Sequence, residues 1–97
     1  MSHATIRIPT PLRTFTKGSD EVRVEGATVA QALANLGEVC PGILERVLDK
    51  DGNPRPFVNV FVGPKDVRTL SGLATALESG AVLSIVPAVA GGAGGSA

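Results

Sequence analysis

The sequence predicts a single α+β domain in which one main helix packs across one face of a mixed β-sheet. Strand patterns occur both before and after a single strong helix pattern, which favours a sheet covered by that helix. The last strand pattern, residues 81–86, is apolar, which agrees with a buried strand. A chain of 97 residues with 43% hydrophobic residues has room for one small core and not for two.

Two segments near the N-terminus, residues 5–9 and 21–25, alternate between polar and apolar side chains. Alternation places successive side chains on opposite faces and predicts two strands. Pro9 and Pro11 end the first strand or bring it to a sheet edge, and the Lys-Gly-Ser sequence at 17–19 marks a turn. We therefore expect a hairpin whose strands are joined by a short loop.

An amphipathic helix is predicted to begin after residue 28. Thr28 can cap it, and Gln31 can complete a capping box. One apolar stripe follows at helical spacing, formed by Val29, Leu33 and Leu36. Gly37 lies near the expected end of the helix, and Pro41 prevents a smooth continuation.

The second half of the chain holds the strongest strand pattern, residues 57–62, which is apolar on nearly both faces. The other expected elements are a helical turn at 43–48, a loop at 49–54, a turn at 63–66, an extended piece at 67–70, a helical turn at 73–77 closed by Gly80, and the final strand at 81–86, ended by Pro87.

Charge and composition exclude several classes of partner. Nine basic and nine acidic residues cancel, and only three aromatic residues, all Phe, are present, so we expect no nucleic-acid binding. No apolar run approaches the roughly 20 residues of a membrane span, and the N-terminus lacks the layout of a signal peptide. A cytoplasmic protein is expected. The single cysteine, Cys40, excludes an internal disulfide and fits a reducing compartment.

No cluster of complementary groups predicts an enzyme, a metal site or a bound cofactor. The only histidine, His3, is expected in a frayed end. Cys40 has no second cysteine or nearby histidine, so a small buried hydrophobe is the expected role. Four acidic residues close in sequence lack calcium-loop spacing and are expected to be solvated: Glu38, Glu45, Asp49 and Asp51.

The glycine-rich end is the one candidate reactive segment. An apolar strand runs directly into Pro-Ala-Val-Ala-Gly-Gly-Ala-Gly-Gly-Ser-Ala at 87–97. Because glycine has no Cβ, such an end could deliver a carboxylate into another protein's active site. A flexible tail or a linker left by cloning would look the same. We expect a domain at residues 1–90 and a flexible tail at 91–97.

Three segments resemble the MoaD/ThiS family of sulfur-carrier proteins, most closely its actinobacterial members that supply sulfur for cysteine biosynthesis from O-phosphoserine. The segments are residues 8–13, residues 57–68, and residues 72–92, the last ending in Pro87-Ala88-Val89-Ala90-Gly91-Gly92. The resemblance implies a ubiquitin-like β-grasp fold, in which the last strand lies in the middle of the sheet, parallel to the first.

The resemblance also implies a mechanism. An ATP-dependent, ubiquitin-activating-like adenylating enzyme would adenylate the carboxylate of the terminal glycine, and sulfide or a persulfide would displace AMP to leave a thiocarboxylate. A sulfur-accepting synthase would then take the sulfur for cysteine or for another product, such as molybdopterin, thiazole or a thiosugar. ATP is used by the activating enzyme, and the carrier itself binds no cofactor.

This chain departs from the family pattern because residues follow Gly91-Gly92. The hypothesis is that a zinc-dependent peptidase, of the kind associated with such carriers, trims the chain after Gly92. Cleavage after Gly94-Gly95, which repeats the motif, is the second option.

The docking surface depends on which face of the 57–62 strand points outward. Val58, Val60 and Val62 share one face, and Phe57 and Phe61 the other. If the two Phe residues point outward they form an apolar patch for a partner; if inward, they are core. The candidate partner-binding residues are Phe57, Phe61, Arg68, Pro87 and Val89.

Two rival functions remain open. A ubiquitin-like protein modifier would be conjugated to lysines of its targets through the same glycine. A plain protein-interaction domain would have no use for the tail.

Overall fold

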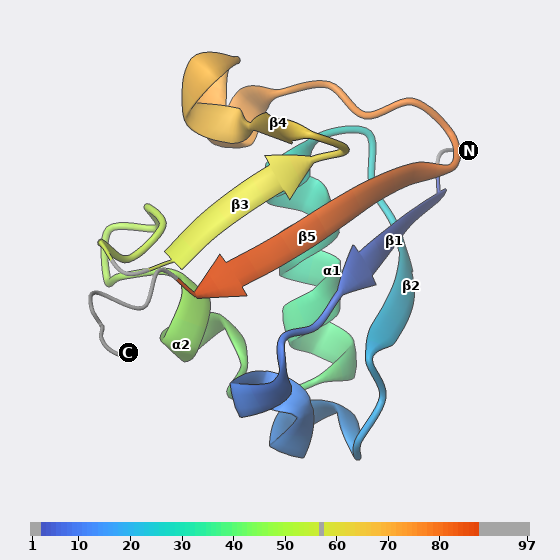
Figure 1. Ribbon diagram of the computed structural model, residues 1–97, viewed down its shortest axis with the longest axis vertical. Helices are drawn as coiled ribbons and strands as arrows, with labels where there is room; N and C mark the ends of the chain where they lie inside the picture. The colour runs from blue at the N-terminus through green and yellow to red at the C-terminus, as the bar shows by residue number, and fades with distance from the viewer. Residues whose placement is uncertain (1–2, 57, 88–97) are drawn as a thin grey trace.

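The computed structural model describes residues 3–56 and 58–87, which form a five-stranded sheet with one main helix across one face (Figure 1). The strands are β1 (His3–Arg7), β2 (Glu21–Glu25), β3 (Val58–Val62), β4 (Lys65–Asp66) and β5 (Ala81–Pro87). The helices are α1 (Val29–Val39) and α2 (Leu44–Val47), with 3₁₀ turns η1 (Thr10–Thr16), η2 (Val67–Thr69) and η3 (Gly72–Ala74). The expected domain boundary at 90/91 lies outside the described residues.

The strand order in the sheet is β2-β1-β5-β3-β4. β5 runs parallel to β1 and antiparallel to β3, and the outer pairs are antiparallel. This confirms the predicted α+β class, the mixed sheet and the central, buried position of the last strand.

Helix α1 begins where the sequence predicts. The Thr28 hydroxyl accepts a hydrogen bond from the Gln31 N–H at 3.2 Å. The Gln31 side chain reaches back to the Ala27 N–H at 2.8 Å, one residue earlier than in a standard capping box. The satisfied N–H groups fix the first turn of the helix, so its apolar stripe faces the sheet.

The core lies between α1 and one face of the sheet. It is formed by aliphatic residues that are at most 2% exposed on the central strands and on α1: Ala4, Ile6, Val60, Leu83, Val29, Ala32, Leu33 and Leu36. α1 crosses behind β5 and β1 in Figure 1, and none of the helices that the structure describes covers the opposite face of the sheet. Within the described ranges, no helix is long and apolar enough to cross a membrane.

The β1–β2 connection differs from the predicted short loop. β1 ends at Arg7, and the 3₁₀ turn η1 then occupies residues 10–16. Pro11 fits the start of this turn because its fixed φ suits a helical conformation and its missing N–H would be unpaired there. The buried Thr16 hydroxyl donates to the Ser19 carbonyl at 2.7 Å, which closes the connection.

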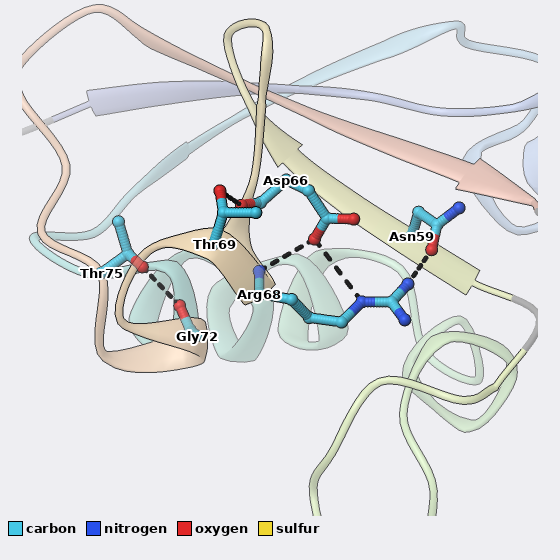
Figure 2. Close-up of polar contacts among 6 residues, drawn as sticks. All are labelled: Asn59, Asp66, Arg68, Thr69, Gly72 and Thr75. Carbon is cyan, nitrogen blue, oxygen red and sulfur yellow. Dashed lines mark hydrogen bonds and ion pairs between the residues drawn. The ribbon is translucent and has the colours of Figure 1, made fainter.

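The segment after β3 also differs from prediction. Residues 65–66, expected in a turn, form β4, and residues 67–69, expected to be extended, form η2. Side-chain hydrogen bonds explain the difference, since the Asp66 carboxylate accepts from the Arg68 N–H at 2.8 Å and the Thr69 hydroxyl donates to the Asp66 carbonyl at 2.7 Å (Figure 2).

The helical turn expected at 73–77 is reduced to η3. The Thr75 hydroxyl donates to the Gly72 carbonyl at 2.6 Å and closes this short turn (Figure 2). The chain then extends, because the Leu77 N–H pairs with the Ala27 carbonyl at 2.8 Å. The connection to β5 is thereby held against the start of α1.

Two glycines lie in close contact with other parts of the chain, Gly26 with backbone atoms and Gly37 with a side chain. A Cβ on Gly26 would lie 2.7 Å from the backbone nitrogen of Ala32. Gly37, expected near the end of the helix, lies inside α1, where a Cβ would lie 2.5 Å from the tip of the Leu44 side chain. Backbone cannot move away cheaply, whereas the end of a leucine side chain can adopt another rotamer.

We therefore expect Gly26→Ala to lower the free energy of unfolding by about 2–3 kcal/mol. Gly37→Ala should change it by less than about 1 kcal/mol, because the gain in helix propensity offsets the displacement of Leu44. Urea denaturation of the two variants checks this. Equal destabilisation by both would contradict the distinction between backbone and side-chain contacts.

Candidate functional site

The two faces of β3 are clearly distinguished. Val58 and Val60 are buried at 8% and 1% exposure and belong to the core. Phe61 lies on the opposite face, is half-buried and is not part of the core cluster. The alternative in which Phe61 is a core residue is therefore wrong. Phe57 lies outside the described residues.

An apolar patch lies on the face of the sheet opposite α1. Phe61 pairs across strands with Ser84 of β5, and Val82 and Val86 lie two residues to either side of Ser84. Val82 and Val86 are 39% and 41% exposed. We call Phe61, Val82 and Val86 the open-face patch, and its exposure makes it available to a partner.

Arg68 lies beside the open-face patch, in η2. Its guanidinium donates to the Asn59 side-chain carbonyl, and its Nε lies 3.5 Å from the Asp66 carboxylate (Figure 2). Asn59 is two residues from Phe61 and pairs with Val86. The arginine is thus held as a polar rim of the patch, and this exposed ion pair contributes little to stability.

Pro87 lies at a different place from Phe61 and Arg68. It is the last residue of β5, opposite Val58, and shares the core face with Leu83 and Ile85. It borders a hollow of about 470 Å³ at the end of the sheet. The structure therefore brings Phe61 and Arg68 together and leaves Pro87 on the other side of the strand.

The remaining predicted site residues lie outside the described residues. They are Val89 and the glycines of the tail, Gly91, Gly92, Gly94 and Gly95. The roles assigned to them from the sequence remain predictions.

The expectation for His3 is wrong, whereas the expectation for Cys40 is confirmed. His3 is in β1 and not in a frayed end: its carbonyl accepts from Gly80 at 2.8 Å, and its Nε2 lies 3.7 Å from the Glu25 carboxylate. Cys40 is buried at 4% exposure, as expected.

The acidic residues do not form one solvated face. Glu38, Glu45 and Asp51 are exposed, but the Asp49 carboxylate accepts hydrogen bonds from the N–H groups of Asp51 and Asn53 at 2.9 and 3.0 Å. Asp49 thereby stabilises its own loop. Within residues 3–56 and 58–87, no group of three or more His, Cys, Asp or Glu side chains could hold a metal ion.

Sequence reasoning missed the contribution of β5 to the patch. Alternation alone places Leu83 and Ile85 on one face and Val82 and Val86 on the other. This signal was present in residues 81–86, but an apolar strand buried on both faces shows the same composition.

A protein-family model described as the ThiS family matches residues 6–92. Among characterised proteins, the sulfur carrier protein CysO of Mycobacterium tuberculosis is 41% identical over 92 residues, which cover 93% of this chain and 99% of the relative. The small archaeal modifier protein 3 of Haloferax volcanii is 40% identical over 68 residues, covering 70% of this chain and 73% of the relative.

Among solved structures, the crystal structure of an Amycolatopsis orientalis BexX/CysO complex contains a chain that superposes with a TM-score of 0.86. The sequence identity is 40%, and the alignment covers 95% of this chain and 99% of that chain. This likeness confirms the ubiquitin-like β-grasp fold.

Replacement by serine is expected to lower the free energy of unfolding by different amounts on the two faces of β3. Val60→Ser buries a hydroxyl and leaves a cavity, so we expect a loss of about 3 kcal/mol in the free energy of unfolding. Phe61→Ser removes a half-exposed ring and should cost about 1 kcal/mol. Thermal unfolding of the two variants measures this difference, and a loss of stability by Phe61→Ser equal to that of Val60→Ser would contradict the assignment of the open face.

Proposed function

The chain belongs to the ThiS/MoaD family of ubiquitin-like sulfur carriers, and we propose that it carries sulfur as a thiocarboxylate on the carboxyl group of Gly92, for the synthesis of cysteine. The observation that carries this proposal is the span of the family match, which runs from residue 6 to residue 92. The match thus includes the end of β1 and all the other strands, and it stops at the second glycine of the first Gly-Gly pair.

The chemistry takes place on the tail and not within the fold. The Gly92 carboxylate attacks the α-phosphorus of ATP on an adenylating enzyme, and pyrophosphate leaves. Hydrosulfide or a persulfide then attacks the acyl carbon; a C–S bond forms, and the bond to AMP breaks. With a persulfide, a thiol must also cleave the S–S bond to release the thiocarboxylate. This chain supplies the carboxyl group and the surface that is recognised, so it acts as a carrier and not as an enzyme.

Activation requires removal of the residues after Gly92. A carboxyl group in a peptide bond cannot be adenylated, and residues 93–97 follow Gly92 in this sequence. We propose trimming by a zinc-dependent peptidase after Gly92. The end of the family match at residue 92 favours this position over Gly95.

The open-face patch is the proposed docking surface for the adenylating enzyme. Two exposed valines and the half-buried Phe61 ring give apolar area, and the rim formed by Arg68 and Asp66 provides polar contacts that fix orientation. The solved A. orientalis CysO is in a complex with BexX, which supports partner docking by a carrier of this shape.

A protein modifier is the second candidate. It is favoured by the 40% identity to the small archaeal modifier protein 3 of H. volcanii. Both functions need adenylation of the same glycine, so the product of the second step separates them. A thiocarboxylate that yields free cysteine with an acceptor synthase supports the carrier, whereas isopeptide bonds to lysines support the modifier.

Intact mass spectrometry tests the carrier proposal. The full chain and a chain ending at Gly92 are each incubated with ATP, sulfide and the adenylating enzyme of the same genome. We expect only the chain ending at Gly92 to gain the mass difference between sulfur and oxygen. Modification of neither chain, by an enzyme active on another carrier, would overturn the proposal, and equal modification of both would overturn the trimming step.

Phe61→Ser tests the docking surface. We expect kcat/KM for thiocarboxylate formation on the chain ending at Gly92 to fall on the order of tenfold, because the ring is the largest apolar group of the patch. Val39→Ser is the matched control, since Val39 is 63% exposed on α1, away from this face. Equal activity of both variants would exclude the patch as the docking surface.

A further inference from the structure

A groove with two lobes lies at the end of the sheet where β5 stops. Its apolar lobe, about 470 Å³, is bordered by Pro9, Leu12, Phe15, Val58, Ile85 and Pro87. Its cationic lobe, about 550 Å³, is bordered by Phe15, Gly42, Glu45, Arg46 and Arg55. Phe15 and Arg46 border both lobes, so the two hollows adjoin across these two side chains. We call this the tail-base groove, because Pro87, the last residue of β5 and of the part of the chain that the structure describes, lies at its edge.

The shared wall of the groove is fixed by packing. The Arg46 guanidinium lies over the Phe15 ring, 6.0 Å from its centre. The ring lies so close to Gly42 that a Cβ there would be 3.2 Å from its Cε1 atom. The backbone of Gly42 has φ +94°, which side chains with a Cβ rarely adopt. The ring thus packs against Gly42, and the guanidinium lies within cation–π distance of it.

The groove carries more positive than negative charge. Two guanidinium groups, Arg46 and Arg55, border the cationic lobe against one carboxylate, Glu45. Among the described residues, neither arginine forms an ion pair with a carboxylate; Arg55 donates through Nε to the backbone carbonyl of Glu45 at 2.8 Å. Residues 88–97 contain no acidic side chain. An Asp or Glu carboxylate on a docking partner would complement these charges.

The position of the groove indicates which partner would contact it. Gly92 is five residues beyond Pro87, and a fully extended chain of five residues spans at most about 18 Å. An enzyme that holds Gly92 in its active site must therefore approach the end of β5, where the groove lies. The adenylating enzyme does this whether the chain is a carrier or a modifier.

We propose that the tail-base groove binds an extended segment of the adenylating enzyme that places an apolar side chain in the apolar lobe and an Asp or Glu carboxylate on Arg46 and Arg55. The inference rests on the proposed function. It adds a second contact to the open-face patch, on the other side of β5. A guanidinium that lies over a ring is well suited to bind a carboxylate, because its planar N–H groups can donate two parallel hydrogen bonds.

Charge reversal tests the groove on the chain ending at Gly92. We expect Arg46→Glu and Arg55→Glu each to raise the KM for the carrier five- to tenfold, on the order expected for losing a charged anchor, with little change in kcat. Arg46→Lys, which keeps the charge but loses the planar N–H groups, should raise the KM less than Arg46→Glu. Lys65→Glu is the matched control, because Lys65 is an exposed cation of β4 that pairs with Val62, at the opposite end of β3 from the groove and not on the face of the open-face patch. Unchanged melting temperatures exclude misfolding as the cause.

A KM no higher for Arg46→Glu than for Lys65→Glu, while the unmutated chain is modified normally, would overturn the groove and leave the proposed function intact. If the unmutated chain is not modified, the proposed function fails. Binding of the enzyme to the groove is then tested by titrating the ¹⁵N-labelled full chain with the same enzyme in the absence of ATP. Chemical-shift changes of the Phe15 and Gly42 amides that Arg46→Glu abolishes would support the proposed groove. No such changes would overturn it.

The same spectra detect a competing occupant. If removal of residues 88–97 alone shifts the Phe15 and Gly42 amides, the chain's own tail occupies the groove, and the assignment to an enzyme segment is wrong. If these shifts instead depend on protein concentration in the absence of enzyme, a second copy of the chain occupies it, which also overturns the proposal.

Discussion

The parallel pairing of β5 with β1 is the constraint on which the rest of this fold depends. It joins residues near the two ends of the chain: Ile6 lies opposite Leu83, and both are completely buried. Such a contact between distant residues carries a large loop-closure cost, which the apolar burial of both strands against α1 must offset. Because β5 also pairs with β3 on its other side, up to its last residue, Pro87 has a fixed position opposite Val58. The place where the chain leaves the sheet is thereby defined by the core and not by the tail.

The alternation of side chains along β5 creates two distinct surfaces around that point. Ile85 and Pro87 belong to the covered face and border the tail-base groove, whereas Val82 and Val86 belong to the open-face patch. A shift of one residue in the pairing with β1 would exchange these sets and expose Leu83. The burial that stabilises the fold therefore also sets which side chains a partner meets on either side of the tail. Stability and recognition depend on the same register.

The sequence predicted those elements whose signals are local. The cap at Thr28, the stripe of α1 and the alternation of β2 each depend on neighbouring residues, and the structure has them at the expected positions. The central place of β5 followed from its apolar composition and from the family resemblance. The 3₁₀ turns η1 and η2 were missed because they are held by specific side-chain bonds, from Thr16 and Asp66, that composition does not reveal. The face of Phe61 was unpredictable because both faces of its strand are apolar, so only packing against α1 distinguishes them. The groove joins η1, the segment around α2 and the strand ends, which are distant in sequence, and no local pattern could indicate it.

The burial of Cys40 has a consequence for the sulfur chemistry proposed for the tail. Its thiol is the only one in the sequence, it is 4% exposed, and it lies at the C-terminal end of α1. Disulfide exchange and oxidation require access to the sulfur atom, so a thiol enclosed by the core is kinetically protected from both. The Cys40 thiol is therefore protected from persulfides and from thiocarboxylates. A mass gain in the proposed assay can accordingly be assigned without competition from a reactive cysteine in the described domain.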